Sequence, residues 1–198
     1  MRIAMFGGSF NPVHIGHVKL VEAVLNEFSL DKVIIMPTYH TPLKDNSQFA
    51  DSEHRYNMCR IAFSGNSRVE VSDLEIKRRG NSYTYMTLNS IKELYSEGEL
   101  YLVVGADMFL GIQTWKNPSE IFKLATLIAV PRDCNDDKLK SHYDNVLRKM
   151  GCKAEFMSHD IMSVSSTMVR EALKNGVYPK NFLDKRVYEY ITENGLYR

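Results

Sequence analysis

One segment near the beginning of the chain restricts the available folds more than any other. A short apolar run, Ile3 to Phe6, ends in two glycines, and a helical apolar pattern follows between Val18 and Phe28. A second apolar run, Val33 to Met36, is stopped by Pro37. Neither run alternates apolar with polar residues, which is typical of strands buried on both faces of a parallel sheet. The segment therefore predicts a βαβ unit.

The same alternation of strand-like and helix-like segments continues along the chain. We expect further strands at residues 69–71, 100–104, 127–130 and 155–157, and further helices at residues 51–63, 84–95, 138–150, 166–174 and 183–193. Such alternation indicates an α/β fold, and we predict a Rossmann-like doubly wound parallel sheet with a small C-terminal helical segment. We expect one domain over residues 1–198, with an α/β core at 1–160 and C-terminal helices at 161–198.

Charge and cysteine content exclude several classes of protein. The 198 residues carry 25 basic and 24 acidic side chains, a formal net charge of +1, so no overall field draws the chain to nucleic acid or to an anionic membrane. Cys59, Cys134 and Cys152 lack the paired spacing of a zinc site or a redox disulfide, and their odd number fits a reducing compartment. No apolar stretch approaches the length of a transmembrane helix or of a signal-peptide core. We therefore expect a cytoplasmic protein.

Candidate functional residues follow four of the expected strands. In doubly wound sheets, ligands bind beyond the carboxyl ends of the strands, and polar or glycine-rich segments come directly after Phe6, Met36, Val104 and Val130. The second of these segments, from Thr38 to Asp51, reads as one long loop, and loops of that length tend to be functional. We expect the ligand site at this edge of the sheet.

The first strand runs into the segment GGSFNPVHIGH, residues 7–17. Its glycines permit close backbone approach, and the start of the helix offers free N–H groups to an anion. It has neither the G-x-G-x-x-G spacing of dinucleotide-binding folds nor the Gly-Lys-Ser/Thr of a Walker A loop. His14 and His17 are three residues apart, so both imidazoles can point toward a bound anion. A capping or solvent-exposed pair is the alternative, and a zinc site would lack a nearby third ligand.

This segment resembles the signature of the HxGH nucleotidyltransferase superfamily, whose members join AMP or CMP to phosphorylated acceptors. More closely, the chain is similar over essentially its whole length to the bacterial nicotinate mononucleotide adenylyltransferases. The further matching motifs are Ser82-Tyr83-Thr84, Gly105-Ala106-Asp107, Trp115, Val164-Ser165-Ser166-Thr167 with Arg170, and the ending Tyr190-Ile191 to Leu196-Tyr197. The resemblance implies an enzyme of NAD biosynthesis that transfers AMP from ATP to nicotinate mononucleotide, giving nicotinate adenine dinucleotide and pyrophosphate.

The resemblance also implies roles for individual residues. The expected catalytic residues are His14, His17, Lys44 and Arg170. The residues expected to bind ATP are Gly7, Gly8, Ser9, Phe10, His14, Gly16, His17, Gly105, Asp107, Ser165, Ser166, Thr167 and Arg170. Those expected to bind nicotinate mononucleotide are Ser9, Lys44, Thr84, Trp115 and Arg132. The C-terminal helices are expected to complete the ATP site, Mg²⁺ to arrive with the ATP phosphates without a protein metal site, and a homodimer is left open.

Several of these residues also have simpler interpretations. Ser165 to Thr167 would serve as a helix N-cap, Asp107 as another helix cap, and Lys44 as a solvated surface charge. Trp115 suits stacking on a pyridine ring, but equally a partly buried position in a loop. Thr84 can cap a helix and also bind the nicotinate carboxylate, and these two roles are compatible.

The sequence departs from the family pattern at three places, and two alternative functions stay open. Leu43 replaces a frequent histidine, Met86 a common aspartate, and Asp133-Cys134 a frequent proline-glycine pair. One alternative is a different acceptor, either nicotinamide mononucleotide or phosphopantetheine; Trp115 and Thr84 argue against the second more strongly than against the first. The other alternative is a nucleotide-binding sensor without turnover.

Overall fold

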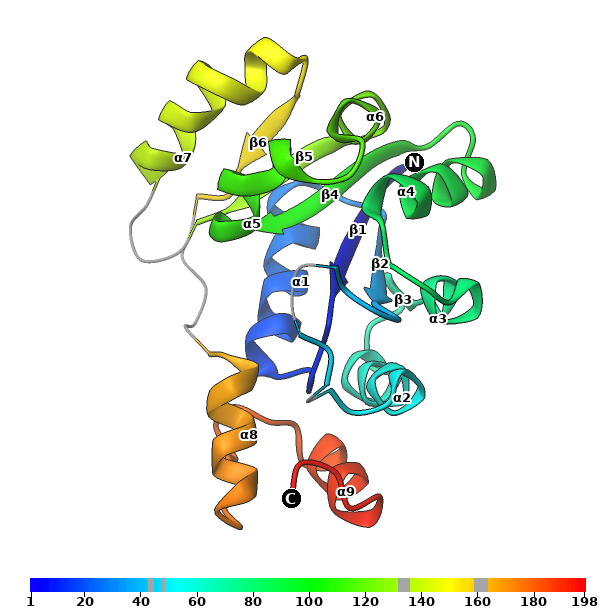
Figure 1. Ribbon diagram of the computed structural model, residues 1–198, viewed down its shortest axis with the longest axis vertical. Helices are drawn as coiled ribbons and strands as arrows, with labels where there is room; N and C mark the ends of the chain where they lie inside the picture. Colours follow the sequence, from blue (N-terminus) through cyan, green and yellow to red (C-terminus); the bar gives the residue numbers. More distant parts are fainter. Residues whose placement is uncertain (43–44, 48, 132–135, 159–163) are drawn as a thin grey trace.

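A six-stranded parallel sheet forms the centre of the computed structural model, which describes residues 1–42, 45–47, 49–131, 136–158 and 164–198 (Figure 1). Every neighbouring pair of strands is parallel, and the strand order is β3-β2-β1-β4-β5-β6. The strands are β1 (Arg2–Gly8), β2 (Lys32–Pro37), β3 (Val69–Val71), β4 (Glu99–Gly105), β5 (Thr126–Val130) and β6 (Ala154–Phe156). The chain therefore builds outward from β1 through β2 to β3, and then returns to the other side of β1 for β4.

Helices connect the strands and cover both faces of the sheet. The α-helices are α1 (Ile15–Glu27), α2 (Ser52–Phe63), α3 (Leu74–Arg78), α4 (Thr84–Leu94), α5 (Ala106–Gly111), α6 (Pro118–Leu124), α7 (Asp136–His142), α8 (Ser166–Lys174) and α9 (Lys185–Glu193). The shorter helical turns are η1 (Ile112–Thr114), η2 (Tyr143–Leu147) and η3 (Arg148–Met150).

Successive strand residues contribute to two separate hydrophobic cores. In β1, Ala4 faces a core formed with α1, α2 and the C-terminal helices, whereas Ile3 and Met5 face a core formed with α4, α5, α6 and α7. The same division holds in β2, where Ile35 joins the first core and Ile34 the second. Both faces of β1 and β2 are thus buried, which is why each of these two strands contains a continuous apolar run. The predicted doubly wound Rossmann-like sheet is confirmed.

The C-terminal segment extends the helical layer that contains α1 and α2. Val169 of α8 and both Val187 and Ile191 of α9 are buried in the first core, next to residues of α1 and α2. Figure 1 shows α8 and α9 at the end of the molecule toward which β1 points. This placement brings the last thirty-odd residues of the sequence to the carboxyl edge of the sheet.

Three differences from the sequence-based expectations lie in short helices. Residues 106–124 fold into α5, η1 and α6, none of which is long enough to show a helical apolar period. The five-residue α3 was not predicted, because it is also too short to show a helical apolar period. The single helix expected at 138–150 is wrong as a uniform α-helix, because α7 changes at Tyr143 into a π turn and then a 3-10 turn that ends at Gly151, whose φ is +81°. None of the described helices is long and apolar enough to cross a bilayer.

Candidate active site

A cavity of about 780 Å³ opens at the carboxyl edge of the sheet. It lies beyond β1 and β4, which are neighbours although the connections from them run in opposite directions across the sheet. Ligands in doubly wound folds bind at this point of divergence, because the loops leaving the two strands separate and leave a crevice. The sequence-predicted residues that line the cavity are Gly7, Gly8, Ser9, His14, Gly16, His17, Thr84, Gly105, Asp107 and Trp115.

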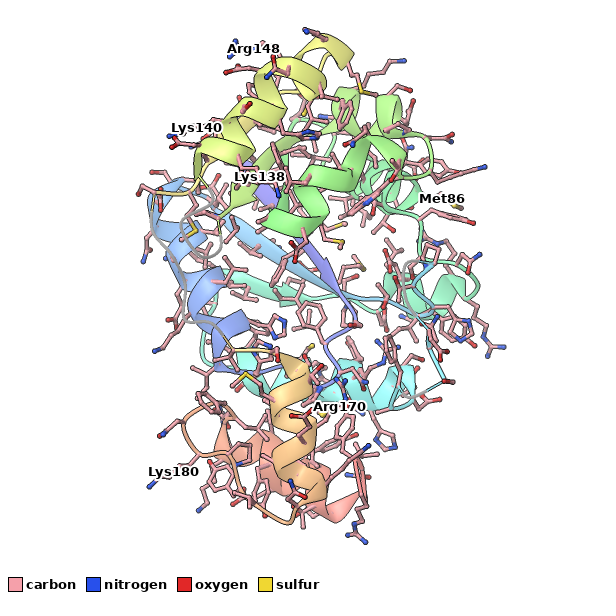
Figure 2. All side chains as sticks on the ribbon, turned by 60° about the vertical axis from the view of Figure 1, so that its left-hand side comes forward. Met86, Lys138, Lys140, Arg148, Arg170 and Lys180 are labelled. Carbon is pink, nitrogen blue, oxygen red and sulfur yellow. The ribbon has the colours of Figure 1, made fainter. Side chains whose placement is uncertain are left out.

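The remaining predicted residues fall into three groups. Phe10 is buried beneath the cavity with 2% of its surface exposed, so its expected part in ATP binding would have to come from its main chain. Ser165 caps α8, and Ser166, Thr167 and Arg170 follow it on this helix, outside the cavity lining. Ser166 and Arg170 contact residues 7–17, called the glycine segment below, and Figure 2 shows Arg170 on α8. Lys44 and Arg132 lie outside the described residues.

The two histidines of the glycine segment are joined in a fixed geometry. His14 is the N-cap residue of α1 and His17 is its third residue, and their rings stack with centroids 3.7 Å apart. The main-chain N–H of His14 donates to Nδ1 of His17 at 3.2 Å. Because Nδ1 accepts this bond, the proton of the neutral His17 ring is on Nε2. His17 therefore presents Nε2–H as a donor.

Burial controls the charge of His14. This residue is 7% exposed, its Nδ1 has no hydrogen-bond partner among the described residues, and burial lowers its pKa to about 4. His14 is therefore neutral near pH 7 in the absence of ligand. Gly16 permits this packing, because a Cβ added there would lie 3.1 Å from Nδ1 of His14, closer than an ordinary van der Waals contact. The two histidines lie at the start of α1 as expected, with His14 as its N-cap residue and buried rather than solvent-exposed, and their part in binding an anion stays a prediction.

The buried ring of Phe10 packs against the histidine pair. Its ring meets His17 edge to face at 5.0 Å between centroids and meets Phe6 at 5.5 Å. Phe10 has a φ of +44°, a conformation that is uncommon for a non-glycine residue and occurs often at functional loops. This turn of the backbone is what buries the phenyl ring while Ser9 stays in the cavity wall.

Residues from the C-terminal segment bind the far end of the glycine segment. Ser166 Oγ donates to the carbonyl of Pro12 at 2.9 Å, and Arg170 Nη1 donates to the carbonyl of Asn11 at 2.8 Å. Tyr197 OH donates to Oδ1 of Asn11 at 2.7 Å. Ser165 caps α8 by accepting from the N–H of Met168, so the expected N-cap is confirmed.

The opposite wall of the cavity is built around the start of α4. Thr84 is the first residue of this helix and follows Tyr83, which is in extended conformation. Ser82 anchors the approach to the helix, because its Oγ accepts from the N–H of Tyr39 at 3.1 Å and its N–H donates to the carbonyl of His40 at 2.8 Å. The N-terminus of α4 therefore faces the cavity with its positive dipole end.

A cluster of buried polar side chains holds the start of α4 in place. Thr87 is fully buried, and its hydroxyl donates to Oε1 of Glu75 at 2.6 Å and accepts from Nη2 of Arg78 at 2.8 Å. Burial raises the pKa of the Glu75 carboxyl. The contacts lie one turn below Thr84, so they hold the start of the helix in place.

Asp107 and Trp115 complete the cavity on the β4 side. Gly105 is the N-cap of α5, so Asp107 lies in the first turn of that helix and its exposed carboxylate faces the cavity. The alternative role of Asp107 as the capping residue is therefore wrong. Trp115 follows η1, is half-buried against the second core and also lines the cavity. The partly buried position of Trp115 in a loop is confirmed, and stacking on a pyridine ring stays a prediction.

Comparison with known proteins agrees with this arrangement. Residues 5–172 match the cytidylyltransferase-like family. The chain is 38% identical over 202 residues to a probable nicotinate-nucleotide adenylyltransferase from Desulfitobacterium hafniense, covering 100% of this chain and 96% of that protein. It is 44% identical over 142 residues to one from Aquifex aeolicus, covering 72% of this chain and 83% of the relative. The chain belongs to the nicotinate-nucleotide adenylyltransferase family.

Solved structures support the same family and fold. A putative nicotinate-nucleotide adenylyltransferase from Vibrio parahaemolyticus superposes with a TM-score of 0.72 at 25% identity, covering 100% of this chain and 96% of that one. A nicotinic acid mononucleotide adenylyltransferase from Plasmodium falciparum, solved with NaAD, superposes with a TM-score of 0.78 at 20% identity, covering 99% and 97%, and shows the fold. The prediction of an adenylyltransferase that forms nicotinate adenine dinucleotide is confirmed.

Met86 is one of the positions at which the chain departs from the family pattern. Met86, where relatives commonly carry aspartate, is exposed on the outer side of α4 and does not line the cavity (Figure 2).

Enzymes that use ATP for nucleotidyl transfer generally need a divalent metal. The described part of the chain holds no group of three or more His, Cys, Asp or Glu side chains that could bind one.

Several residues near the site were missed by sequence reasoning. Arg55 and Tyr197 bond to the glycine segment, Glu75 and Thr38 line the cavity, and none of the four was assigned a role from the sequence. Arg55 carried a signal, since it stands at helical spacing with the apolar residues Met58 and Cys59. A charged residue on the core-facing side of a helix needs partners, and here the partners are in the active site.

Proposed function

We propose that the transfer of AMP from ATP to nicotinate mononucleotide proceeds by direct in-line attack of the acceptor phosphate oxygen on the α-phosphorus of ATP. The P–O bond to pyrophosphate breaks as the new P–O bond forms, so no enzyme nucleophile is needed. The observation that carries the proposal is that one cavity joins the stacked histidines of the HxGH segment to the N-terminus of α4 and Trp115. Phosphate-handling groups and an acceptor wall thus face the same space.

The ATP side relies on donors that are oriented before ATP binds. His17 offers Nε2–H, whose direction is set by the bond at Nδ1 and by the stacked ring of His14. Pre-oriented donors stabilise the charge that develops on the phosphates, because they need no rearrangement during the reaction. Arg170 lies on α8 within hydrogen-bonding distance of Asn11, and we assign its cationic group to the triphosphate together with Ser165, Ser166 and Thr167.

The acceptor side suits an anionic ring substituent. The N-terminus of α4 opens into the cavity, and Thr84, the first residue of this helix, lines the cavity wall. We assign the nicotinate carboxylate to the hydroxyl of Thr84 and the adjacent N–H groups, with the pyridine ring stacked on Trp115. A helix N-terminus attracts a carboxylate more than a neutral amide, which favours nicotinate over nicotinamide mononucleotide. Lys44 and Arg132 stay predictions for phosphate and acceptor contact.

We further propose that Mg²⁺ is the metal and that it binds through the phosphates of ATP. Mg²⁺ keeps several water ligands and needs few protein carboxylates, which fits a cavity whose lining includes the exposed Asp107. When bound, the ion would neutralise phosphate charge. Asp107 can accept a hydrogen bond from a metal-bound water or from a ribose hydroxyl.

Residues 161–198 are proposed to complete the ATP site of a single domain. The support is the set of bonds from Ser166, Arg170 and Tyr197 to the glycine segment, and the shared core with α1 and α2. A chain without these residues would leave Asn11 and Pro12 without these partners.

Pyrophosphate release from ATP tests the proposal. The protein is supplied with ATP and Mg²⁺ and, separately, with nicotinate mononucleotide, nicotinamide mononucleotide or phosphopantetheine. We expect release with the first and about two- to thirtyfold less with the second, which corresponds to the energy of about 0.3–2 kcal/mol for one charge at a helix N-terminus. Equal rates with both mononucleotides would refute the carboxylate assignment. ATP binding without release in every case would identify a nucleotide-binding sensor.

A further inference from the structure

Arg55 is a charged residue enclosed in the protein beside the active site. It lies on α2, is 1% exposed, and is the largest fully buried side chain among the described residues. Its guanidinium donates four hydrogen bonds, all to main-chain carbonyls. Nε donates to Ala50 at 2.9 Å, Nη1 to Ser9 at 2.8 Å, and Nη2 to Thr38 at 2.7 Å and Tyr39 at 3.1 Å.

The four carbonyls belong to segments that form different parts of the cavity. Ser9 is in the glycine segment that leads into His14 and His17. Thr38 and Tyr39 begin the loop after β2, and Ala50 is close to the end of that loop. One side chain therefore holds the glycine segment and both ends of the loop in a single arrangement.

The arrangement continues to the acceptor wall. The N–H of Tyr39 and the carbonyl of His40 both bond to Ser82, two residues before the start of α4. A continuous path of hydrogen bonds thus runs from Ser9 through Arg55 and residues 38–40 to Ser82. It joins the wall proposed for ATP to the wall proposed for the acceptor.

We propose that Arg55 is a positioning residue that sets the distance between the ATP half and the acceptor half of the active site. The proposal rests on the proposed function, because it concerns the alignment of the two substrates. In-line attack depends on this alignment, since a displacement of about 1 Å can lower a rate by roughly 10²-fold. Only arginine suits the position: its planar fork spans carbonyls on several sides, whereas lysine presents three donors from a single point.

The test compares Arg55→Lys with Arg55→Gln and with a control, Arg2→Lys. Arg2 is at the amino end of β1, away from the cavity, and its guanidinium donates to Tyr101 OH and to the carbonyl of Phe28. It is thus also a multiply bonded arginine. For each variant, the folded fraction is measured by circular dichroism and thermal unfolding, and kcat and the KM values for both substrates are measured well below the melting temperature.

We expect the Arg55 variants to lose about 10- to 100-fold in kcat at full folded fraction, with raised KM values for both ATP and the acceptor. Arg2→Lys should lower the melting temperature and leave both KM values unchanged. A purely structural role for Arg55 would reduce only the amount of folded enzyme. Unchanged KM values and a normal kcat per folded molecule would therefore overturn the proposal, as would failure of both Arg55 variants to fold.

A second measurement separates this proposal from the proposed function. Hydrogen exchange is followed at the amides of residues 7–11 and 38–41, with and without ATP, in the wild-type chain and in Arg55→Lys. We expect faster exchange in both segments of the variant and weaker ATP binding. If the wild-type chain releases no pyrophosphate with any acceptor, the proposed function fails while this comparison still decides the role of Arg55. Exchange that is unchanged in one segment would overturn the coupling of the two halves.

Discussion

Replacing Gly16 with alanine is expected to disturb catalysis more than stability. The added methyl would lie 3.1 Å from Nδ1 and 3.2 Å from Cε1 of His14. In a helix, alanine gains about 0.5–1 kcal/mol over glycine, whereas overpacking costs about 1–3 kcal/mol, so the net loss in the free energy of unfolding is about 0–2.5 kcal/mol. For a chain of this size that is a fall in Tm of up to about 10 °C.

The effect on turnover follows from the stacking of the two imidazoles. The His14 ring is buried and its centroid is 3.7 Å from that of His17, so relief of the contact must displace the pair together by a few tenths of an ångström. Because a 1 Å displacement can cost about 10²-fold, we expect a loss of about tenfold in kcat from this smaller shift. Pyrophosphate release at saturating ATP and acceptor measures it.

Gly111→Ala is the matched control. Gly111 ends α5, and a Cβ added there would meet nothing within 4 Å. This variant should keep the wild-type kcat. If Gly16→Ala also turned over at the wild-type rate, the reasoning that Gly16 positions the histidine pair would be refuted.

Four further results are expected. His17→Ala removes the oriented donor and should lower kcat by about 10²- to 10³-fold with an unchanged circular dichroism spectrum; near-normal turnover would exclude the role. Tyr197→Phe removes the bond to Asn11 and should lower the free energy of unfolding by about 0.5–1.5 kcal/mol in urea titrations, with a raised KM for ATP. Trp115→Ala should raise the KM for the acceptor and leave that for ATP nearly unchanged; an equal rise in both would place the ring elsewhere. The pKa of His14 is about 4 in the folded chain and about 6.5 in the unfolded chain, so the unfolded chain binds a proton more readily between these values. The free energy of unfolding is therefore retained above pH 6.5 and should fall by up to about 3 kcal/mol between pH 6.5 and 4. Urea titrations over this pH range should show a smaller fall for His14→Gln than for the wild-type chain.

Strands β1, β2, β4 and β5 could be predicted because each contains a continuous apolar run, whereas β3 and β6 are three-residue strands with a glutamate between two apolar residues. The run from Leu100 to Val104 appears in the structure as β4 with one more residue at each end. The short helices between Ala106 and Leu124 could not be predicted, since six or seven residues hold too few turns for an apolar period to appear. Pro118 at the first turn of α6 was the local sign available there.

In the active site, the contacts between residues close in the sequence could be predicted, and those between residues far apart in the sequence could not. His14, Gly16 and His17 form their geometry within one turn of α1, so their spacing was informative. Arg55 and Ser9 are 46 residues apart, and no local pattern relates a helix residue to a carbonyl in a different loop. Likewise Thr87, an ordinary helix threonine in the sequence, proves to be buried with Glu75. Contacts of this kind depend on the completed fold.

The bond between Tyr197 and Asn11 has a consequence for the order in which the protein is made. The two residues are separated by 186 positions, so a ribosome working at about 5–20 residues per second adds Tyr197 about 10–40 s after Asn11. For the first 159 of those positions the nascent glycine segment has neither Arg170 nor Tyr197 to bind, and Tyr197 is added later still. The first motif to be synthesised is thus among the last to reach its final form, and a nascent chain should acquire tight ATP binding only after its C-terminal helices emerge.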